Sequence, residues 1–428
     1  MKQTYDPAIF EHIMEGLETD QHVVATYYFE QEDVTDHLEL VGFMTLEAST
    51  GGWIDFPGET PDVRKNLGAK VVGYYPVPQV REGVKGAIVQ VAFPLKGPVG
   101  WEGDIPMLLT AVAGNITSMP GRVILEDIWF PKSLCNVFPG PRFGVDGIRE
   151  LLGVPDRPLV NMMIKPKLGL PPKVIAEMCY EAAMGGVDHI KDDEMLAETY
   201  NCTFEDRVRE VVRALRRAYE ECGKKVIYTV NVTDRTGRVL DKARKAVEMG
   251  ASGVMVNFPC GLETLRSLAE DASIGVPILF HPAGSESVTR ISRVVWAKLA
   301  RLCGADIYLP GSAWVKWATV AELERYVRAK HALQAKFYDL PKTFALLSSV
   351  AGKVPVFVAD YGTDVILGGG AAIHGHPAGI RAGVRAIRQA IDAVTSGQPL
   401  DEYAEEHEEL RLALERFGKF ERPREKRY

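Results

Sequence analysis

Two lysine-rich segments of this chain contain the residue types that metal-assisted proton transfer needs. The first is Lys-Pro-Lys-Leu-Gly at 165–169, and the second is Lys-Asp-Asp-Glu at 191–194. Lysine and carboxylate side chains are rarely fully buried unless they are paired, and carboxylate oxygens are the ligands that hard divalent cations prefer. The clustering therefore predicts a site for a divalent cation and proton transfer rather than a packed core.

The composition sets limits on the protein class. The chain has 428 residues, of which 46% are hydrophobic and 25% charged, enough for a full-size core and two domains. Its formal net charge of -7 provides no basic surface for nucleic acid or for an anionic membrane. The N-terminus is polar and acidic, and no apolar run reaches a membrane-spanning length. We therefore expect a cytoplasmic protein that binds neither nucleic acid nor membrane.

From about residue 158 onward, short β-branched runs alternate with amphipathic helical patterns. Phe204–Cys222 is the clearest helix, because its apolar residues recur at helical spacing. Eight such strand–helix units in succession predict a parallel (β/α)₈ TIM barrel over residues 141–428, with a charged helical tail at its end. The predicted strands are Leu159–Ile164, Val187–Ile190, Val226–Val232, Gly253–Asn257, Ile278–His281, Asp306–Leu309, Thr343–Leu347 and Val365–Leu367.

The first 140 residues have a different pattern. Val23–Phe29, Ala87–Phe93 and Arg122–Trp129 are predicted strands, and Ile105–Ala113 is a predicted helix. This mixture predicts a smaller ferredoxin-like α+β domain over residues 1–140, in front of the barrel. The Pro- and Gly-rich segment 138–141 marks the predicted boundary.

The active site of a TIM barrel lies at the C-terminal ends of its strands, and the notable residues of this chain fall there. Each one alone has a structural explanation: a solvated turn, a flexible glycine run or a buried histidine. Their shared position at one rim favours a functional explanation. The residues are Lys165, Lys167, Lys191, Asp193, Glu194, Asn231, His281, Lys316, Gly368, Gly369 and Gly370.

With these motifs the chain resembles the RuBisCO superfamily large subunit over nearly its full length. Besides the two lysine segments, Glu47 to Trp53 and Gly114-Asn115 match places where that family sends residues into a neighbouring subunit's active site. The resemblance implies at least a homodimer whose active sites are shared between subunits. It also implies substrate- or phosphate-binding roles for Glu47, Trp53, Asn115, Gly368, Gly369 and Gly370.

The resemblance further implies a Mg²⁺ site built from a CO₂-carbamylated Lys191 with Asp193 and Glu194. Lys165 is then the proton-transfer base, with Lys167 and His281 beside the reacting oxygens. Elementary chemistry is consistent with these roles. A lysine must be neutral to take up CO₂, and its carbamate is an oxygen anion that a metal and two carboxylates can hold. The metal polarises a carbonyl, and a desolvated lysine with a lowered pKa can take the adjacent proton.

The chain departs from true carboxylases at two phosphate-binding positions. Pro282 follows His281 where carboxylases have an arginine, and Leu309 stands where they have a histidine. The segment 347–350, Leu-Ser-Ser-Val, takes the place of their serine-glycine-glycine segment. A bisphosphate is therefore a poor fit. The sequence at 374–377 and 412–419 instead resembles the RuBisCO-like proteins, the form IV branch.

Other positions distinguish the chain from the methionine-salvage diketone enolases of that branch. Asn115, Lys165 and Lys167 are of the carboxylase type. Lys316 lies five residues after Gly311, where carboxylases place a mobile-loop lysine against a carboxylate. An ammonium group at this position favours a substrate or product that bears a carboxylate.

The combined prediction is a Mg²⁺-dependent enzyme that forms an enolate from a monophosphorylated keto-sugar or keto-sugar acid. Decarboxylation or transcarboxylation of a β-keto acid sugar phosphate uses every retained group. A ketose-phosphate isomerase or tautomerase of the enolase type needs the same metal and base but not Lys316. A true ribulose-bisphosphate carboxylase and a non-catalytic phosphometabolite-binding protein remain further alternatives.

Overall fold

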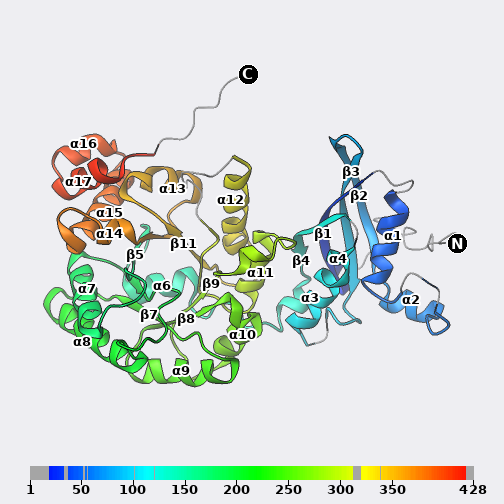
Figure 1. Cartoon of the computed structure of the whole chain (residues 1–428), viewed down its shortest axis with the longest axis horizontal. Helices are drawn as coiled ribbons and strands as arrows, with labels where there is room; N and C mark the ends of the chain where they lie inside the picture. The colour runs from blue at the N-terminus through cyan, green and yellow to red at the C-terminus, as the bar shows by residue number, and fades with distance from the viewer. Residues whose placement is uncertain are drawn as a thin grey trace. The chain divides into compact units, whose positions relative to one another are not determined.

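The computed structural model describes residues 19–32, 37–51, 54, 56–100, 102–119, 121–311, 320–337 and 339–420. The chain divides into two compact units (Figure 1). The first comprises Met1–Phe138 and Glu286–Trp296, and the second comprises Pro139–Ser285 and Ala297–Tyr428. The excursion at 286–296 belongs to the first unit because the backbone N–H of Leu125 donates to the carbonyl of Arg290 at 2.8 Å.

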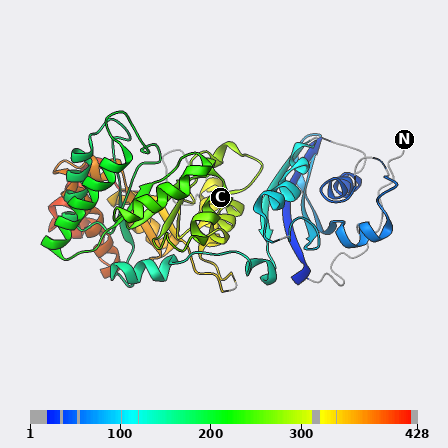
Figure 2. The same cartoon turned by 90° about the horizontal axis from the view of Figure 1, so that it is seen from below.

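The first unit is a four-stranded antiparallel sheet with the order β2-β3-β1-β4. This strand order and the intervening helices confirm the predicted ferredoxin-like α+β domain. Burial alternates along β1, as expected for a strand with one face toward a core. Helix α1 lies alongside one face of the sheet (Figure 2). The elements are β1 His22–Glu32, α1 His37–Glu47, α2 Pro61–Leu67, β2 Lys70–Arg81, β3 Val84–Pro94, α3 Ile105–Ala113, α4 Asn115–Ser118, β4 Arg122–Trp129 and α5 Lys132–Cys135.

The second unit contains a closed barrel of parallel strands, β5 to β12 in sequence order around the ring. The predicted TIM barrel is therefore confirmed, and each predicted strand overlaps an observed one. The strands are β5 Leu159–Met163, β6 His189–Lys191, β7 Ile227–Asn231, β8 Gly253–Asn257, β9 Ile278–His281, β10 Ile307–Tyr308, β11 Phe344–Ser348 and β12 Val365–Gly369.

Helices surround the barrel (Figure 1). Helix α8 spans the predicted Phe204–Cys222, beginning after the Thr203 hydroxyl cap and ending at Gly223, whose φ of 69° suits glycine. Within the described residues, no helix is both long and apolar enough to cross a bilayer. The helices are α6 Gly144–Leu152, α7 Pro172–Gly185, α8 Phe204–Cys222, α9 Thr236–Glu248, α10 Leu262–Glu270, α11 Arg293–Leu302, α12 Val320–Gln334, α13 Val354–Tyr361, α14 Ala371–His374, α15 Gly379–Ser396, α16 Leu400–Glu405 and α17 Glu408–Phe417.

The hydrophobic core of the barrel gathers toward the N-terminal ends of the strands. Leu159, Met255 and Phe344 from the strands pack there with Val145 and Ile148 of α6. Helix α6 thus covers this end with apolar side chains, whereas Lys165, Lys167, Asp193 and Glu194 follow the C-terminal ends of β5 and β6. The packing leaves the C-terminal rim as the place where charged side chains meet.

Candidate active site

The predicted lysines and carboxylates come together at the C-terminal rim of the barrel. Lys165 and Lys167 follow β5, and Asp193 and Glu194 follow β6. The Lys165 ammonium group donates a hydrogen bond to Asp193, and the Lys167 Nζ donates to Glu194 Oε1 at 2.6 Å. The Asp193 side chain is fully buried, whereas 47% of the Lys167 side chain is exposed. The site therefore presents buried anions beneath cations that can contact solvent or a ligand.

Lys191 is the last residue of β6 and is completely buried. Its Nζ donates to the backbone carbonyl of Asp192 at 2.8 Å and lies 4.0 Å from Glu194 Oε2. Burial lowers the pKa of Lys191 to about 8, although the carboxylates of Glu194, Asp193 and Asp192 act to raise it. A substantial fraction of this amine is therefore neutral near physiological pH, as CO₂ uptake requires.

We expect the rate of activation by bicarbonate to rise with pH. Because the lowered pKa of Lys191 is about 8, its neutral fraction is about one tenth at pH 7 and about one half at pH 8. The rate of activation is measured by pre-incubation with Mg²⁺ and bicarbonate at pH 7, 8 and 9, followed by an activity assay at a single pH. An activation rate independent of pH contradicts the prediction that Lys191 is the CO₂ acceptor.

His281 ends β9 and lies beside the same carboxylate, with Nε2 3.8 Å from Glu194 Oε2. Burial, followed by the charge of Lys191, lowers the pKa of His281 to about 3. Its Nδ1 accepts the backbone N–H of Ala283 at 3.2 Å, so the neutral ring has its hydrogen on Nε2. Burial alone raises the pKa of Glu194, but the hydrogen bond from Lys167 and the nearby cations bring it down to about 2. His281 is therefore a neutral donor next to an ionised carboxylate.

Two asparagines hold the backbone on which Glu194 is placed. The amide Nδ2 atoms of Asn231 and Asn257 donate to the Glu194 carbonyl at 3.0 and 2.8 Å. Asn257 was not among the predicted site residues. Its position at the C-terminal end of β8 matches that of Asn231 on β7, and this shared strand-end position is the signal that identifies it.

Asp192, one of the carboxylates in the Lys-Asp-Asp-Glu motif, does not share the environment of Asp193. It is fully buried and accepts hydrogen bonds from Arg207 Nε at 3.1 Å, Tyr228 hydroxyl at 2.9 Å and the Asn231 backbone N–H at 3.0 Å. Successive side chains of an extended chain point to opposite sides, which separates Asp192 from its neighbours. Of the three carboxylates in the Lys-Asp-Asp-Glu segment, Asp193 and Glu194 thus belong to the site, and Asp192 supports them.

We expect Asp192→Ala to lower the free energy of unfolding by about 3–5 kcal/mol, because it leaves the buried Arg207 cation without its partner. Chemical denaturation measures the change. The control is Asp206→Ala, since Asp206 pairs with Arg209 at an exposed position and its removal should change the free energy of unfolding much less. Equal effects of the two substitutions contradict the supporting role of Asp192.

The three glycines at the end of the eighth strand, β12, have different surroundings. A Cβ atom on Gly369 would lie 2.6 Å from the Ile373 side chain, so packing requires glycine there. A Cβ on Gly370 would lie 3.5 Å from Cε of Lys165, which places Gly370 beside the site. The short α14 follows these glycines, and α15 begins at Gly379.

The N-terminal unit contains another pair of predicted residues. Asn115 opens α4, and its Nδ2 donates to Oε1 of Glu47, the last residue of α1, at 3.5 Å. Trp53 and Lys316, which were also predicted to contribute, lie outside the described residues. Leu309, where carboxylases have a histidine, is partly buried and packs against the barrel core.

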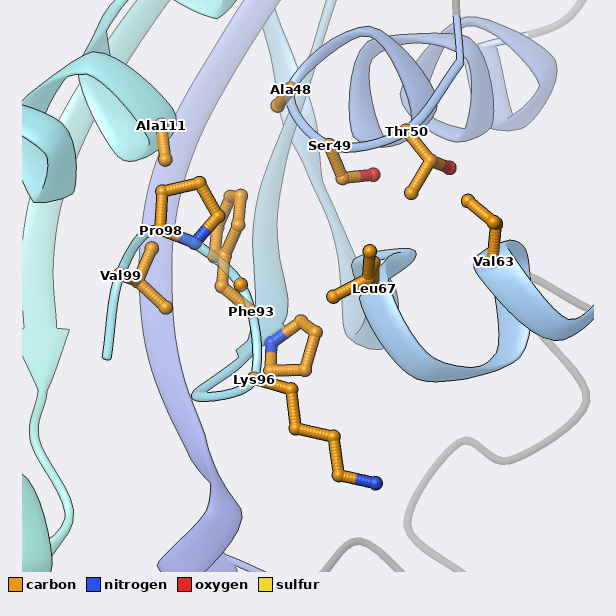
Figure 3. A pocket seen from close by; sticks show the side chains of 12 residues that line it. Ala48, Ser49, Thr50, Val63, Leu67, Phe93, Lys96, Pro98, Val99 and Ala111 are labelled. Atoms are coloured by element: carbon orange, nitrogen blue, oxygen red, sulfur yellow. The ribbon is translucent and has the colours of Figure 1, made fainter. Parts of the chain in front are cut away.

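A hollow of about 500 Å³ lies in the same unit, beside the end of α1 (Figure 3). Its walls are mostly apolar, and its polar side chains are already engaged. Ser49 donates to the Thr45 carbonyl at 2.9 Å, and Lys96 donates to Asn66 Oδ1 at 3.2 Å. In Figure 3 the ammonium end of Lys96 extends away from the other labelled side chains. This hollow therefore offers a mostly apolar shape, and Lys96, the one cation among the described residues that line it, is held toward the Asn66 amide.

The donor chemistry at the rim fits a Mg²⁺ ion once Lys191 is modified. In the described part of the chain, no three His, Cys, Asp or Glu side chains are grouped as metal ligands. Asp193 and Glu194 supply two carboxylates, and a carbamate on the buried Lys191, 4.0 Å from Glu194, would supply the further oxygen donor. Oxygen ligands of this kind are those that Mg²⁺ prefers.

Comparison with known proteins places this site in a family. The model of the ribulose bisphosphate carboxylase large chain, catalytic domain, matches residues 144–417, and that of its N-terminal domain matches residues 14–134. A ribulose bisphosphate carboxylase-like protein of Archaeoglobus fulgidus is 41% identical, over 97% of this chain and 98% of its own. A 2,3-diketo-5-methylthiopentyl-1-phosphate enolase of Geobacillus kaustophilus is 37% identical, over 92% and 98%.

A solved structure agrees with these matches. The crystal structure of a rubisco-like protein from Alicyclobacillus acidocaldarius is similar with a TM-score of 0.83 and 34% identity, and the similarity covers 93% of this chain and 100% of that one. Sequence and structure are therefore shared along both units. The chain belongs to the ribulose bisphosphate carboxylase large-chain family, within its RuBisCO-like branch.

Proposed function

We propose that the chain is a Mg²⁺-dependent enzyme that forms an enolate from a monophosphorylated keto compound. The observation that supports it most is the buried Lys191 with a lowered pKa, 4.0 Å from Glu194 and next to two carboxylates with lysine partners. Such perturbed groups at a barrel rim are typical of a catalytic site. A purely structural cluster has no need for three lysines in one place.

In this proposal, a carbamate on Lys191 together with Asp193 and Glu194 would hold Mg²⁺, which would supply polarisation of the substrate carbonyl and so make the adjacent C–H more acidic. Lys165, once its ammonium group has released a proton to solvent, accepts the substrate proton as the neutral amine. The pKa of Lys167 is raised, chiefly by its hydrogen bond to Glu194, so it remains a cation that can donate to the developing oxyanion. His281 supplies a neutral N–H donor to the same oxygen atoms.

The substrate class follows from the phosphate-binding residues. Pro282 and Leu309 offer neither charge nor a hydrogen bond donor for a second phosphate. We propose that backbone N–H groups at Gly368, Gly369 and Gly370, of which Gly370 lies beside Lys165, bind one phosphate. A contribution from Trp53, which lies outside the described residues, is proposed from the sequence alone. We propose that Glu47 and Asn115 act in the site of a partner subunit, so that the working unit is a homodimer.

Enolisation without carbon loss is the better supported outcome, because a relative 37% identical over nearly the whole chain is named as an enolase. This is the reaction that the sequence analysis ranks second. Decarboxylation of a β-keto acid sugar phosphate remains the second candidate, since Lys316 provides a cation that enolisation does not require. Both reactions pass through the same enolate.

The test is NMR of reactions in D₂O with Mg²⁺ and bicarbonate, using 2,3-diketo phosphates, monophosphorylated keto-sugars and their β-keto acids. Deuterium incorporation without carbon loss supports the enolase reaction. Deuterium incorporation with CO₂ release supports decarboxylation. No exchange with any substrate overturns the proposal in favour of a phosphometabolite-binding protein.

Lys316→Ala separates the two candidate reactions. If the lysine contacts a substrate carboxylate, we expect decarboxylation to fall by about 10²–10³-fold while proton exchange changes little. The two rates are measured on one β-keto acid and one keto-sugar phosphate, with the exposed Lys336→Ala as control. An equal loss of both rates contradicts a carboxylate-specific role.

A further inference from the structure

A second hollow lies at the opposite end of the barrel from the carboxylate cluster. It has a volume of about 570 Å³ and is bounded by the end of α6, by α8 and by the segments that lead into β7, β8 and β9. We call it the basal hollow. The chemistry of TIM barrels occurs at the other end, so the fold and the proposed function leave this hollow unexplained. Its size is within the range of small-molecule sites.

The floor and walls of the basal hollow are apolar and partly open to solvent. Leu151 is 38% exposed and Tyr219 is 48% exposed, and both line the hollow with the half-buried Val212, Leu215 and Val226. Exposed apolar side chains gathered in one concave place differ from the single exposed side chains of an ordinary surface. The hollow can therefore cover the apolar part of a ligand.

Three cations line the same hollow, namely Arg216, Lys224 and Lys225. Within the described residues, none of the three has an ion pair or a side-chain hydrogen bond. The neighbouring arginines of α8 differ. Arg209 lies 2.8 Å from Asp206, and Arg217 lies 3.1 Å from Glu177. In α8, Arg209 and Arg217 thus have carboxylate partners, whereas Arg216, which lines the hollow, has none among the described residues.

A polar hollow of about 500 Å³ adjoins the apolar one and shares Lys224 and Lys225 with it. Arg388 lines this extension, and its buried Nη1 has no hydrogen bond partner. The nearest carboxylate, that of Asp188, lies 3.8 Å away and is occupied by Arg157, with both contacts at 2.7 Å. Glu150 and Asp156 line this extension as well, so among the described residues its four cations, Arg157, Lys224, Lys225 and Arg388, exceed its three carboxylates by one. Arg216 of the apolar hollow adds a further positive charge.

We propose that the basal hollow binds an organic phosphate, with its apolar or aromatic body against Leu151, Leu215 and Tyr219 and its phosphate near Lys224 and Lys225. Apolar area supplies part of the affinity, and the unpaired cations select the anion. The apolar hollow of the N-terminal unit lacks this combination, because Lys96 is the one cation in the described part of its lining and no group of cations adjoins the apolar surface there. The site lies in one unit and does not depend on the proposed enolate chemistry.

The test measures binding of 1-naphthyl phosphate to the full-length protein by calorimetry at low salt. We expect Lys224→Glu with Lys225→Glu to weaken binding by at least about tenfold, since two charge-assisted contacts are lost. The matched control replaces two exposed lysines elsewhere on the barrel unit with glutamate, namely Lys173→Glu with Lys336→Glu. It should change the affinity for 1-naphthyl phosphate by less than about twofold. Tyr219→Asp, at a half-exposed position, should also weaken binding.

Inorganic phosphate serves as the second probe, and it should bind more weakly than naphthyl phosphate because it lacks the apolar body. Equal affinity of wild type and the Lys224/Lys225 variant overturns the proposal, because the probe then binds at the catalytic rim or elsewhere. A lack of any binding to wild type also overturns it. So does a change of oligomeric state in the variant by sedimentation, which shows that the hollow is an interface between copies of the chain.

Discussion

Replacing Lys191 with methionine is expected to abolish Mg²⁺-dependent enolisation, with a fall in kcat of more than about 10³-fold. Carbonyl polarisation by a metal is worth several kcal/mol, and each 1.36 kcal/mol is about tenfold in rate. Methionine retains an unbranched side chain against Met255, which lies 3.9 Å from the Lys191 amine, and removes only the group that can take up CO₂. The measurements are deuterium incorporation and the ¹³C carbamate signal after labelling with bicarbonate.

The free energy of unfolding of the Lys191→Met variant shows whether its loss of activity comes from the missing amine or from unfolding. Burial lowers the pKa of Lys191 to about 8 from its ordinary 10.5, so the folded state disfavours the charged amine. The resulting cost to stability is fully present below about pH 8 and disappears as the pH rises above the unfolded pKa. The methionine variant should therefore be at least as stable as wild type at pH 7 in chemical denaturation. A stable variant whose activity remains within tenfold of that of the wild type contradicts the metal-site proposal. The control is Lys173→Met, at an exposed position.

Lys165→Ala is expected to lower proton exchange by about 10²–10⁴-fold, the range for loss of a general base. Metal binding should persist, because Asp193 and Glu194 remain and Asp193 loses a competing ammonium partner. Calorimetric titration with Mg²⁺ and deuterium exchange measure the two effects separately. A parallel loss of metal binding and exchange contradicts a role for Lys165 as the base.

Chemical rescue sharpens the comparison between the two lysines. A small primary amine such as ethylamine can occupy the space left by Lys165→Ala, next to Gly370, and accept the proton. The same amine cannot replace the carbamate held in the closed, fully buried environment of Lys191. We expect rescue of exchange in Lys165→Ala and none in Lys191→Met. Rescue of both variants, or of neither, argues against distinct roles.

The barrel strands were predictable from sequence because each is a short apolar run followed by an amphipathic helix. Strand β2, Lys70–Arg81, was not predicted. It contains Gly73 and Pro76, two residue types that argue against a strand when the sequence alone is considered. The sheet order shows that β2 is an edge strand bonded only to β3, a position that tolerates proline. Sequence patterns do not reveal which strand will form the edge.

The sequence by itself determined the family, the two fold types and the motifs whose lysines and carboxylates meet at one rim. Only the tertiary structure decided the environment of each residue. It separated Asp192, bound by Arg207, from Asp193 at the site, and it showed that Gly369 is required by packing whereas Gly370 adjoins Lys165. Motifs record residue type and spacing along the chain. Burial and charge, which set the pKa of Lys191, depend on segments that are distant in sequence and meet only after folding.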